Sequence, residues 1–246
     1  PPMIGIFSGS LIGFGASHVP FPIMHVTLAV LAAAVLNAAS NGLNQICDLQ
    51  NDRINKPHRP LPSGRMSMAQ AWTFVVLTYL AALAMVAVVN WETLAIYVVA
   101  ALSTVAYSAP PVRLKRHPLG SNLIIALIRG WLLKVAGWAA VATVLKSMEP
   151  WYIGFIYFVF LLGATTTKDF ADIDGDRAAG CITLPVRYGA TSSARAISPA
   201  FIAPWLLLPL GLYLRVLSGH ATAILALAVI MLAWGSYVIY LINQDP

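Results

Sequence analysis

Charged residues are scarce in this chain of 246 residues, of which only 10% are charged and 59% are hydrophobic. A soluble globular domain carries roughly 25% charged residues, so this composition excludes an ordinary soluble domain. The mean hydropathy of +0.77 agrees with that exclusion. The apolar residues form long continuous runs and not the alternating segments of an outer-membrane β-barrel. We therefore expect an all-α membrane protein, a polytopic helical bundle.

Eight apolar runs have about the length that a membrane-spanning helix needs, which is about 20 residues. These runs are expected at residues 1–17, 20–46, 68–90, 92–109, 119–143, 150–168, 195–215 and 220–242. No linker or change of composition divides the chain, so residues 1–246 are expected to form a single transmembrane domain.

A secretory leader and a disulfide framework are also missing. The first residues carry neither the charged start nor the cleavage site of a signal peptide, so none is expected. The two cysteines, Cys47 and Cys181, each lie beside an acidic segment. We expect both thiols to be reduced, because those segments are assigned below to the cytoplasmic side.

Lys and Arg residues are distributed unevenly between the expected spans, and this asymmetry predicts orientation. Eleven of them follow the second, fourth and sixth spans: Arg53, Lys56, Arg59, Arg65, Arg113, Lys115, Arg116, Lys168, Arg177, Arg187 and Arg195. The opposite loops contain only Lys146 and Arg215. The protein is therefore expected to be an integral, multi-pass membrane protein with its basic loops in the cytoplasm. This basic face accounts for the net charge of +6, so no nucleic-acid partner is expected.

Acidic residues are the rarest charged group, and six of the nine fall in two short clusters. The first cluster has Asn44, Asp48 and Asp52 at spacings of four, which places the three side chains along one stripe of a helix. Asn37 and Asn41 extend that stripe backwards into an apolar segment. Such polar groups are expected to face the bundle interior or water, because lipid would leave them without hydrogen-bond partners.

The second cluster repeats this design 124 residues later, with Lys168, Asp172 and Asp176 at the same spacing. Asp169 adds a further acid that is able to face either way, and Asp174 is expected to be solvated. A single Asp pair at a helix end is more often a solvated cap than a site. Two pairs at a constant offset favour a site made from two pseudo-repeated Asp motifs.

Several carboxylates converging at one membrane face would repel each other unless cations lie among them. Mg²⁺ suits such a group, because it prefers one or two carboxylates together with phosphate oxygens of a substrate. The neighbouring Arg and Lys side chains suit a polyanion bound by the same metal ions. This combination predicts a diphosphate site.

Three separated motifs carry a resemblance to a known family. They are Asn-x3-Asp-x3-Asp running into "INKPHRPLPSG", the loop "YSAPPVRLK", and "KDFADIDGDRAAGCITLPVRYG". In this order they resemble the UbiA superfamily of intramembrane prenyltransferases. The resemblance implies nine helices in a ring around a central cavity. We therefore expect the last helix to lie beyond Pro246.

The resemblance also implies roles for individual residues. Two Mg²⁺ ions would be bound by Asn44, Asp48, Asp52, Asp169, Asp172 and Asp176. The diphosphate would contact Arg53, Lys56 and Arg59, and the covering loop would supply Tyr107, Ser108, Arg113 and Lys115. Lys168 departs from the Asn found in many second motifs and is familiar from the homogentisate-type branch.

Other polar residues lie within the expected spans. An intramembrane charge is by default a functional hypothesis, so Arg129 is a candidate for contact with the acceptor or the diphosphate, with a structural partner as the alternative. Lys134, nearer the middle of the same span, needs a buried partner or water. Asn41 and Asn122 are expected to line the same cavity.

The predicted function is Mg²⁺-dependent transfer of a polyprenyl group from an allylic polyprenyl diphosphate to a lipophilic acceptor, with release of diphosphate. The acceptor could be an aromatic, a chlorophyllide-like or a glycerol-phosphate compound, and the sequence does not decide among them. Membrane lipid is the other expected partner. A UbiA-type terpene cyclase, which quenches the allylic cation internally, is the alternative on the same fold.

Two further readings fit the sequence less well. A CDP-alcohol phosphotransferase would need further acids downstream of "DGDR", and none follows until Asp245. A transporter would favour acids near helix breaks at the bilayer centre, whereas these acids lie at helix ends beside basic loops.

Overall fold

The structure is a computed structural model that describes residues 2–17, 19–178, 180 and 182–244, and it gives only the backbone at residues 118, 172 and 178. Throughout these residues the regular elements are helical. The longer helices are α1 (Pro2–Ser17), α2 (Ile23–Cys47), α4 (Met68–Ala87), α5 (Trp91–Ser108), α8 (Glu149–Ala164), α12 (Ala203–Tyr213) and α13 (Ala221–Gln244).

One further span is continuous but changes its geometry. It consists of α6 (Pro118–Ile125), the π-helix η2 (Ala126–Leu132) and α7 (Leu133–Ala139). Shorter helices make up the connections: α3 (Leu49–Asn55), η1 (Leu114–Arg116), η3 (Thr167–Asp172), α9 (Ile173–Ala178), α10 (Leu184–Tyr188), α11 (Ala190–Ile197) and η4 (Ser198–Phe201).

The predicted all-α polytopic bundle is confirmed. Seven helical stretches of the described chain are long and apolar enough to cross a membrane, beginning with Ile23–Cys47 and ending with Ala221–Gln244. The eighth expected span corresponds to Pro2–Ser17, which is apolar but has 16 residues. All eight expected segments therefore coincide with apolar helices.

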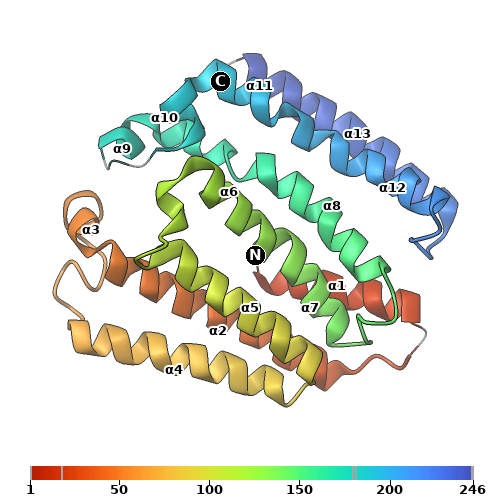
Figure 1. Cartoon of the computed structure of the whole chain (residues 1–246), viewed down its shortest axis with the longest axis horizontal. Helices are drawn as coiled ribbons and strands as arrows, with labels where there is room; N and C mark the ends of the chain where they lie inside the picture. The colour runs from red at the N-terminus through yellow and green to blue at the C-terminus, as the bar shows by residue number, and fades with distance from the viewer. Residues whose placement is uncertain (1, 18, 179, 181, 245–246) are drawn as a thin grey trace.

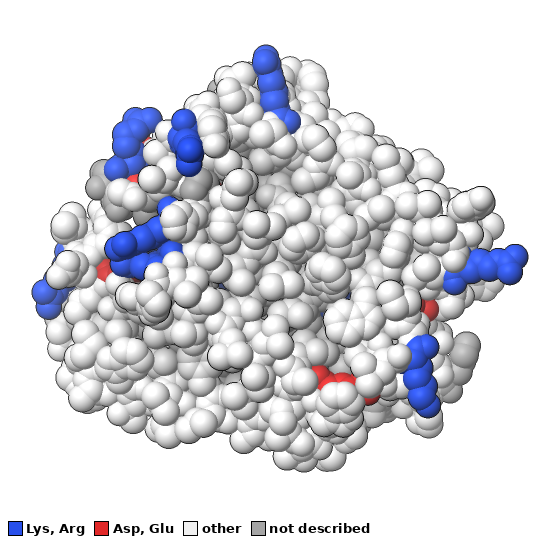
Figure 2. Space-filling model, in the orientation of Figure 1, with Lys and Arg blue, Asp and Glu red and all other residues white. Residues whose placement is uncertain are grey.

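The helices pack side by side with their axes roughly aligned (Figure 1). Helix α2 contacts α4 and α5, α1 contacts α7 and α2, and α8 contacts η2 and α12, which in turn contacts α13. The short helices α3, α9 and α10 lie together at one end of the bundle (Figure 1). Lys and Arg side chains gather at this same end (Figure 2). The polar connections thus form one basic face.

Two acids outside the two clusters, Glu92 and Glu149, hold loops at helix starts. The Glu92 carboxylate accepts hydrogen bonds from the Thr143 hydroxyl at 2.6 Å and the Val144 amide at 2.8 Å. The buried Glu149 carboxylate accepts from the Ser218 amide at 2.9 Å and the Ser218 hydroxyl at 2.8 Å. These two carboxylates therefore satisfy loop groups and lie apart from the clustered acids.

Helices α1 and α7 pack with their backbones close together. The Ser10 hydroxyl of α1 donates to the Gly137 carbonyl of α7 at 2.8 Å. A Cβ at Gly137 would overlap the Ile6 carbonyl oxygen, and one at Gly9 would lie 2.6 Å from the Lys134 carbonyl oxygen. This contact fixes the α6–α7 span against α1.

We expect Gly137→Ala to destabilise the protein by about 1–3 kcal/mol, because the added methyl group forces two backbones apart. Gly15→Ala is the matched control, since a Cβ there meets nothing within 4 Å. Thermal unfolding of the purified protein in detergent, followed by Trp fluorescence, measures the effect. Equal melting temperatures for the two variants would contradict this view of the α1–α7 contact.

Candidate functional site

A cavity of about 800 Å³ opens at the basic end of the bundle. The predicted residues that line it are Asn44, Asp48, Asp52, Lys56, Arg59, Tyr107, Arg113, Lys115, Asn122, Lys168, Asp169 and Asp176. The two acidic motifs and the loop between α5 and α6 therefore meet around one space, although they are far apart in sequence.

Asp48 is the meeting point of the first motif and the α5–α6 loop. Its carboxylate accepts from Arg113 Nη2 at 2.7 Å and from Lys115 Nζ at 2.5 Å. Lys115 also donates to Asn44 Oδ1 at 2.7 Å. Arg113 adopts a left-handed backbone with φ of 40°, which turns the loop back toward the end of α2. One carboxylate thus ties two basic side chains to the cavity wall.

Asp52 lies in the same wall and is almost fully buried, with 4% of its surface exposed. Its Oδ2 atom lies 2.6 Å from Arg59 Nη1, so the turn after α3 closes back on the motif. Helix α2 ends at Cys47 and α3 begins at Leu49, so Asp48 lies at a turn between the two helices. Although the helix breaks at Asp48, all three motif residues line the cavity.

The second motif folds differently from the first, as the 3-10 helix η3 followed by α9. Asp169 is 6% exposed, and its carboxylate accepts from Lys168 Nζ at 2.5 Å. Asp176 lines the cavity beside them. The side chain of Asp172 lies outside the described residues. Asp174 is solvated as predicted, since its side chain is 97% exposed and pairs only loosely with Arg177 at 3.3 Å.

Some polar wall residues were not singled out by the sequence, namely Asn51, Asn55, Arg116, His117 and Ser121. The sequence does contain a signal for the two amides, because each stands three residues after an Asp of the first motif, and residues three apart share a helix face. Asn55 donates to Asn51 Oδ1 at 2.9 Å.

Other predicted residues differ in their placement. Asn122 lies in the wall and donates to the Thr166 hydroxyl at 2.6 Å. In contrast, Arg53 is exposed and does not line either cavity described here. Three predicted residues, Asn41, Ser108 and Arg129, line a second cavity instead.

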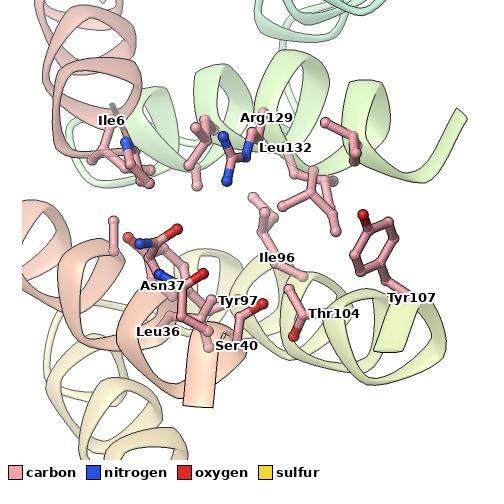
Figure 3. Close-up of a pocket in the computed structure, with 18 of the residues that line it drawn as sticks. Ile6, Leu36, Asn37, Ser40, Ile96, Tyr97, Thr104, Tyr107, Arg129 and Leu132 are labelled. Atoms are coloured by element: carbon pink, nitrogen blue, oxygen red, sulfur yellow. The ribbon is translucent and has the colours of Figure 1, made fainter. Parts of the chain in front are cut away.

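This second cavity has a volume of about 230 Å³, and Figure 3 shows residues that line it from facing helices. Its apolar wall comes from α1, α2, α5, α6, η2 and α7: Ile6, Ala33, Leu36, Ile96, Ala100, Ile125, Ile128, Leu132, Leu133 and Ala136. Asn44 and Tyr107 line both cavities, so the two spaces adjoin. A charged compartment therefore adjoins a mostly apolar one.

The charges of the larger cavity favour a polyanion. Its lining contains six Lys or Arg residues and four Asp residues, so positive charge is in excess. Within the described part of the chain, no three His, Cys, Asp or Glu side chains come together as a preformed metal site. The hard oxygen donors nevertheless suit Mg²⁺, which takes few protein ligands and completes its shell with phosphate oxygens and water.

Comparison with known proteins places these features in a family. The model of the UbiA prenyltransferase family matches residues 4–246. A probable homogentisate phytyltransferase 2, chloroplastic, of Oryza sativa subsp. japonica is 35% identical over 160 residues, covering 62% of this chain and 42% of that protein. A digeranylgeranylglyceryl phosphate synthase of Methanopyrus kandleri is 34% identical over 209 residues, covering 84% of this chain and 74% of that protein.

The arrangement of helices also matches a solved structure. A UbiA homolog from Archaeoglobus fulgidus bound to GPP and Mg²⁺ superposes with a TM-score of 0.81 and 22% sequence identity. The match covers 100% of this chain and 82% of that one. At this level of identity the likeness establishes the fold.

We expect Arg59→Ala to lower the free energy of unfolding by roughly 1–3 kcal/mol, because it leaves the buried Asp52 carboxylate without its partner. In a double-mutant cycle with Asp52→Asn, the two effects should be less than additive. Arg53→Ala, at an exposed position on α3, is the matched control and should change stability little. Additive effects in chemical or thermal unfolding would show that the pair is not coupled.

Proposed function

This chain belongs to the UbiA prenyltransferase family, and from this we propose that it transfers a polyprenyl group from an allylic polyprenyl diphosphate to a lipophilic acceptor. The observation that carries the proposal is the junction of a charged cavity and an apolar cavity at Asn44 and Tyr107. An allylic diphosphate has the same division between a polyanionic head and an apolar tail. The names of the rice and Methanopyrus relatives support both an aromatic and a glyceryl phosphate acceptor.

The basic side chains of the larger cavity bind the diphosphate head in this proposal. Arg113 and Lys115 reach the cavity from the α5–α6 loop, and Lys56 and Arg59 reach it from the turn after α3. Lys168 approaches from the second motif. Guanidinium and ammonium groups are strong donors to phosphate oxygens, and they stabilise the negative charge that develops on the leaving diphosphate.

The clustered oxygen donors hold Mg²⁺, in our proposal two ions, through Asn44, Asp48, Asp52, Asp169, Asp172 and Asp176. When bound, Mg²⁺ supplies Lewis-acid stabilisation to the diphosphate leaving group. Asp48, Asp52 and Asp169 each have a Lys or Arg partner in the present arrangement. We infer that the basic side chains turn from the carboxylates to the diphosphate when the head group binds, which frees carboxylate oxygens for metal. The GPP and Mg²⁺ in the A. fulgidus homolog support this assignment.

The apolar cavity holds the first part of the tail and keeps water from the reacting carbon. In the reaction the bond between C1 and the diphosphate oxygen breaks, with its electron pair leaving on the diphosphate. The acceptor then forms a bond to C1 and loses a proton. Tyr107 lies at the junction where C1 would be placed, and Ser108 donates to Asn44 Oδ1 at 3.3 Å beside it. Positioning and exclusion of water supply much of the rate in such a site.

We further propose that the charged cavity faces the cytoplasm. Its end of the bundle carries most of the Lys and Arg residues, which is the distribution of cytoplasmic loops. The long tail would then extend from the junction into the membrane lipid.

The test of this function incubates the purified protein with Mg²⁺, geranylgeranyl diphosphate and candidate acceptors, and identifies products by mass. We expect Asp48→Ala and Asp176→Ala to reduce diphosphate release by about 10²-fold or more, because each removes an electrostatic contact to the reacting group. Asp174→Ala is the matched control from the same segment and should keep its activity, since that side chain is solvated. Undiminished release by the first two variants, or a tail that closes on itself without an acceptor, would contradict the proposal.

Mg²⁺ and diphosphate should stabilise the protein together more than the sum of their separate effects. The reason is that the carboxylates are paired with Lys or Arg until an anion draws these bases away. Thermal unfolding with Mg²⁺ alone, inorganic diphosphate alone and both together measures this coupling. EDTA should abolish both the joint stabilisation and the release of diphosphate. If Mg²⁺ alone raised the melting temperature as much as Mg²⁺ and diphosphate together, the basic side chains would not need to leave the carboxylates before metal binds.

A further inference from the structure

A buried hydrogen bond joins α6 to the segment that carries the second acidic motif. Asn122 of α6 donates from Nδ2 to the Thr166 hydroxyl at 2.6 Å. Both side chains are closed off from solvent, with 8% of Asn122 and 0% of Thr166 exposed. Asn122 lines the larger cavity, whereas Thr166 does not. Such a bond is costly to break, because the remaining partner is left buried and unsatisfied.

Thr166 stands directly before the second motif. It occupies the N-cap position of η3, and its carbonyl accepts from the Asp169 amide at 2.9 Å. A Thr at an N-cap commonly caps the following helix with its side chain, but Thr166 makes no such bond. Its hydroxyl is held by Asn122 instead. The start of η3 is therefore attached to a neighbouring helix.

The second motif has little local structure of its own to hold it in place. Helix η3 consists of six residues, and 3-10 helices are short because their hydrogen-bond geometry is poor. Helix α9 also has only six residues, too few to be stable in isolation. Asp169 and Asp176 of this motif nevertheless line the larger cavity. Their placement thus depends on tertiary contacts such as the bond between Asn122 and Thr166.

The first motif is tied to the same helix. The loop that leads into α6 contains Arg113 and Lys115, which both bond to the Asp48 carboxylate. Asn122 then bonds from within α6 to Thr166. Helix α6 and the loop before it therefore connect the two acidic motifs through side-chain contacts, one set to each motif.

We propose that Asn122 is a positioning residue, which acts through Thr166 to hold the second motif where it shares Mg²⁺ and the diphosphate with the first. This inference rests on the proposed function, because that function assigns the metal ions to the two motifs. It gives Asn122 a role other than direct contact with the substrate. Groups that orient metal ligands without touching the metal typically change metal affinity by about 10- to 100-fold when they are replaced.

Equilibrium binding of Mg²⁺ to the full chain in detergent, with inorganic diphosphate present, tests this role without turnover. The melting temperature is followed as Mg²⁺ is titrated, which gives the Mg²⁺ concentration at half-maximal stabilisation. We expect Thr166→Val, which removes the hydroxyl at nearly constant volume, to raise this concentration about 10-fold. Thr166→Ser should restore most of the lost affinity, because it keeps the hydroxyl.

Thr167→Val is the matched control. Thr167 is the next residue along the chain and is exposed, and its hydroxyl donates to the Ala164 carbonyl at 2.8 Å. The control should therefore leave the Mg²⁺ concentration at half-maximal stabilisation unchanged.

Asn122→Ala breaks the same bond from the α6 side, and it takes the place of Thr166→Val if that variant does not fold. In the double variant the two effects on Mg²⁺ affinity should be less than additive, because only one bond is lost. Additive effects would overturn the proposal, since Asn122 would then act independently of Thr166. It is also overturned if the single variants lower the melting temperature but leave the Mg²⁺ affinity unchanged.

Failure of the proposed function has a different signature. The variants would still weaken the binding of Mg²⁺ with inorganic diphosphate, yet the unaltered protein would form no prenylated product with any acceptor.

Discussion

The contact of the Asp48 carboxylate with Arg113 and Lys115 is the interaction on which the site depends. It joins the end of α2 to the loop after α5, and so it brings together segments more than 60 residues apart in sequence. Without it, the partly exposed Asp48 carboxylate would lack a partner in the same cavity wall as the buried Asp52. The basic side chains neutralise the clustered carboxylates, so the protein can fold with these acids close together before any metal ion or anion binds. The same pairing makes the bases available to a diphosphate.

The adjoining cavities divide the work of recognition between two kinds of chemistry. The larger cavity offers charge, and the smaller one offers an apolar surface interrupted by one polar wall. Tyr107 and Asn44 line both, so a ligand that occupies the two spaces would lie against these two residues. In our proposal the larger cavity binds the diphosphate and the smaller one binds the start of the tail, so C1 between them is held where the two cavities adjoin.

Much of this arrangement could be predicted from the sequence because membrane composition restricts the choices so strongly. Long apolar runs predicted each of the eight helices, and clustered acids predicted most of the larger cavity. The break at Asp48 was not predicted, because a spacing of four is compatible with one continuous helix. The burial of Asp169 was left open, since periodicity does not predict a 3-10 helix at the second motif. Asn51 and Asn55 were not predicted, because the prediction followed only the stripe of residues 44, 48 and 52.

The π-helix at Ala126–Leu132 has a consequence for how this span can vary in length. A π-helical turn, with hydrogen bonds between residues five apart, contains about one residue more than an α-helical turn. Loss of one residue there would restore a regular α-helix, and the two halves of the span would keep their relative orientation because the wide turn absorbs the extra residue. Relatives that are one residue shorter in this stretch would then keep the packing of α7 on α1 while presenting a different side chain to the cavity. A single-residue gap in an alignment would thus mark a change in the wall of the smaller cavity.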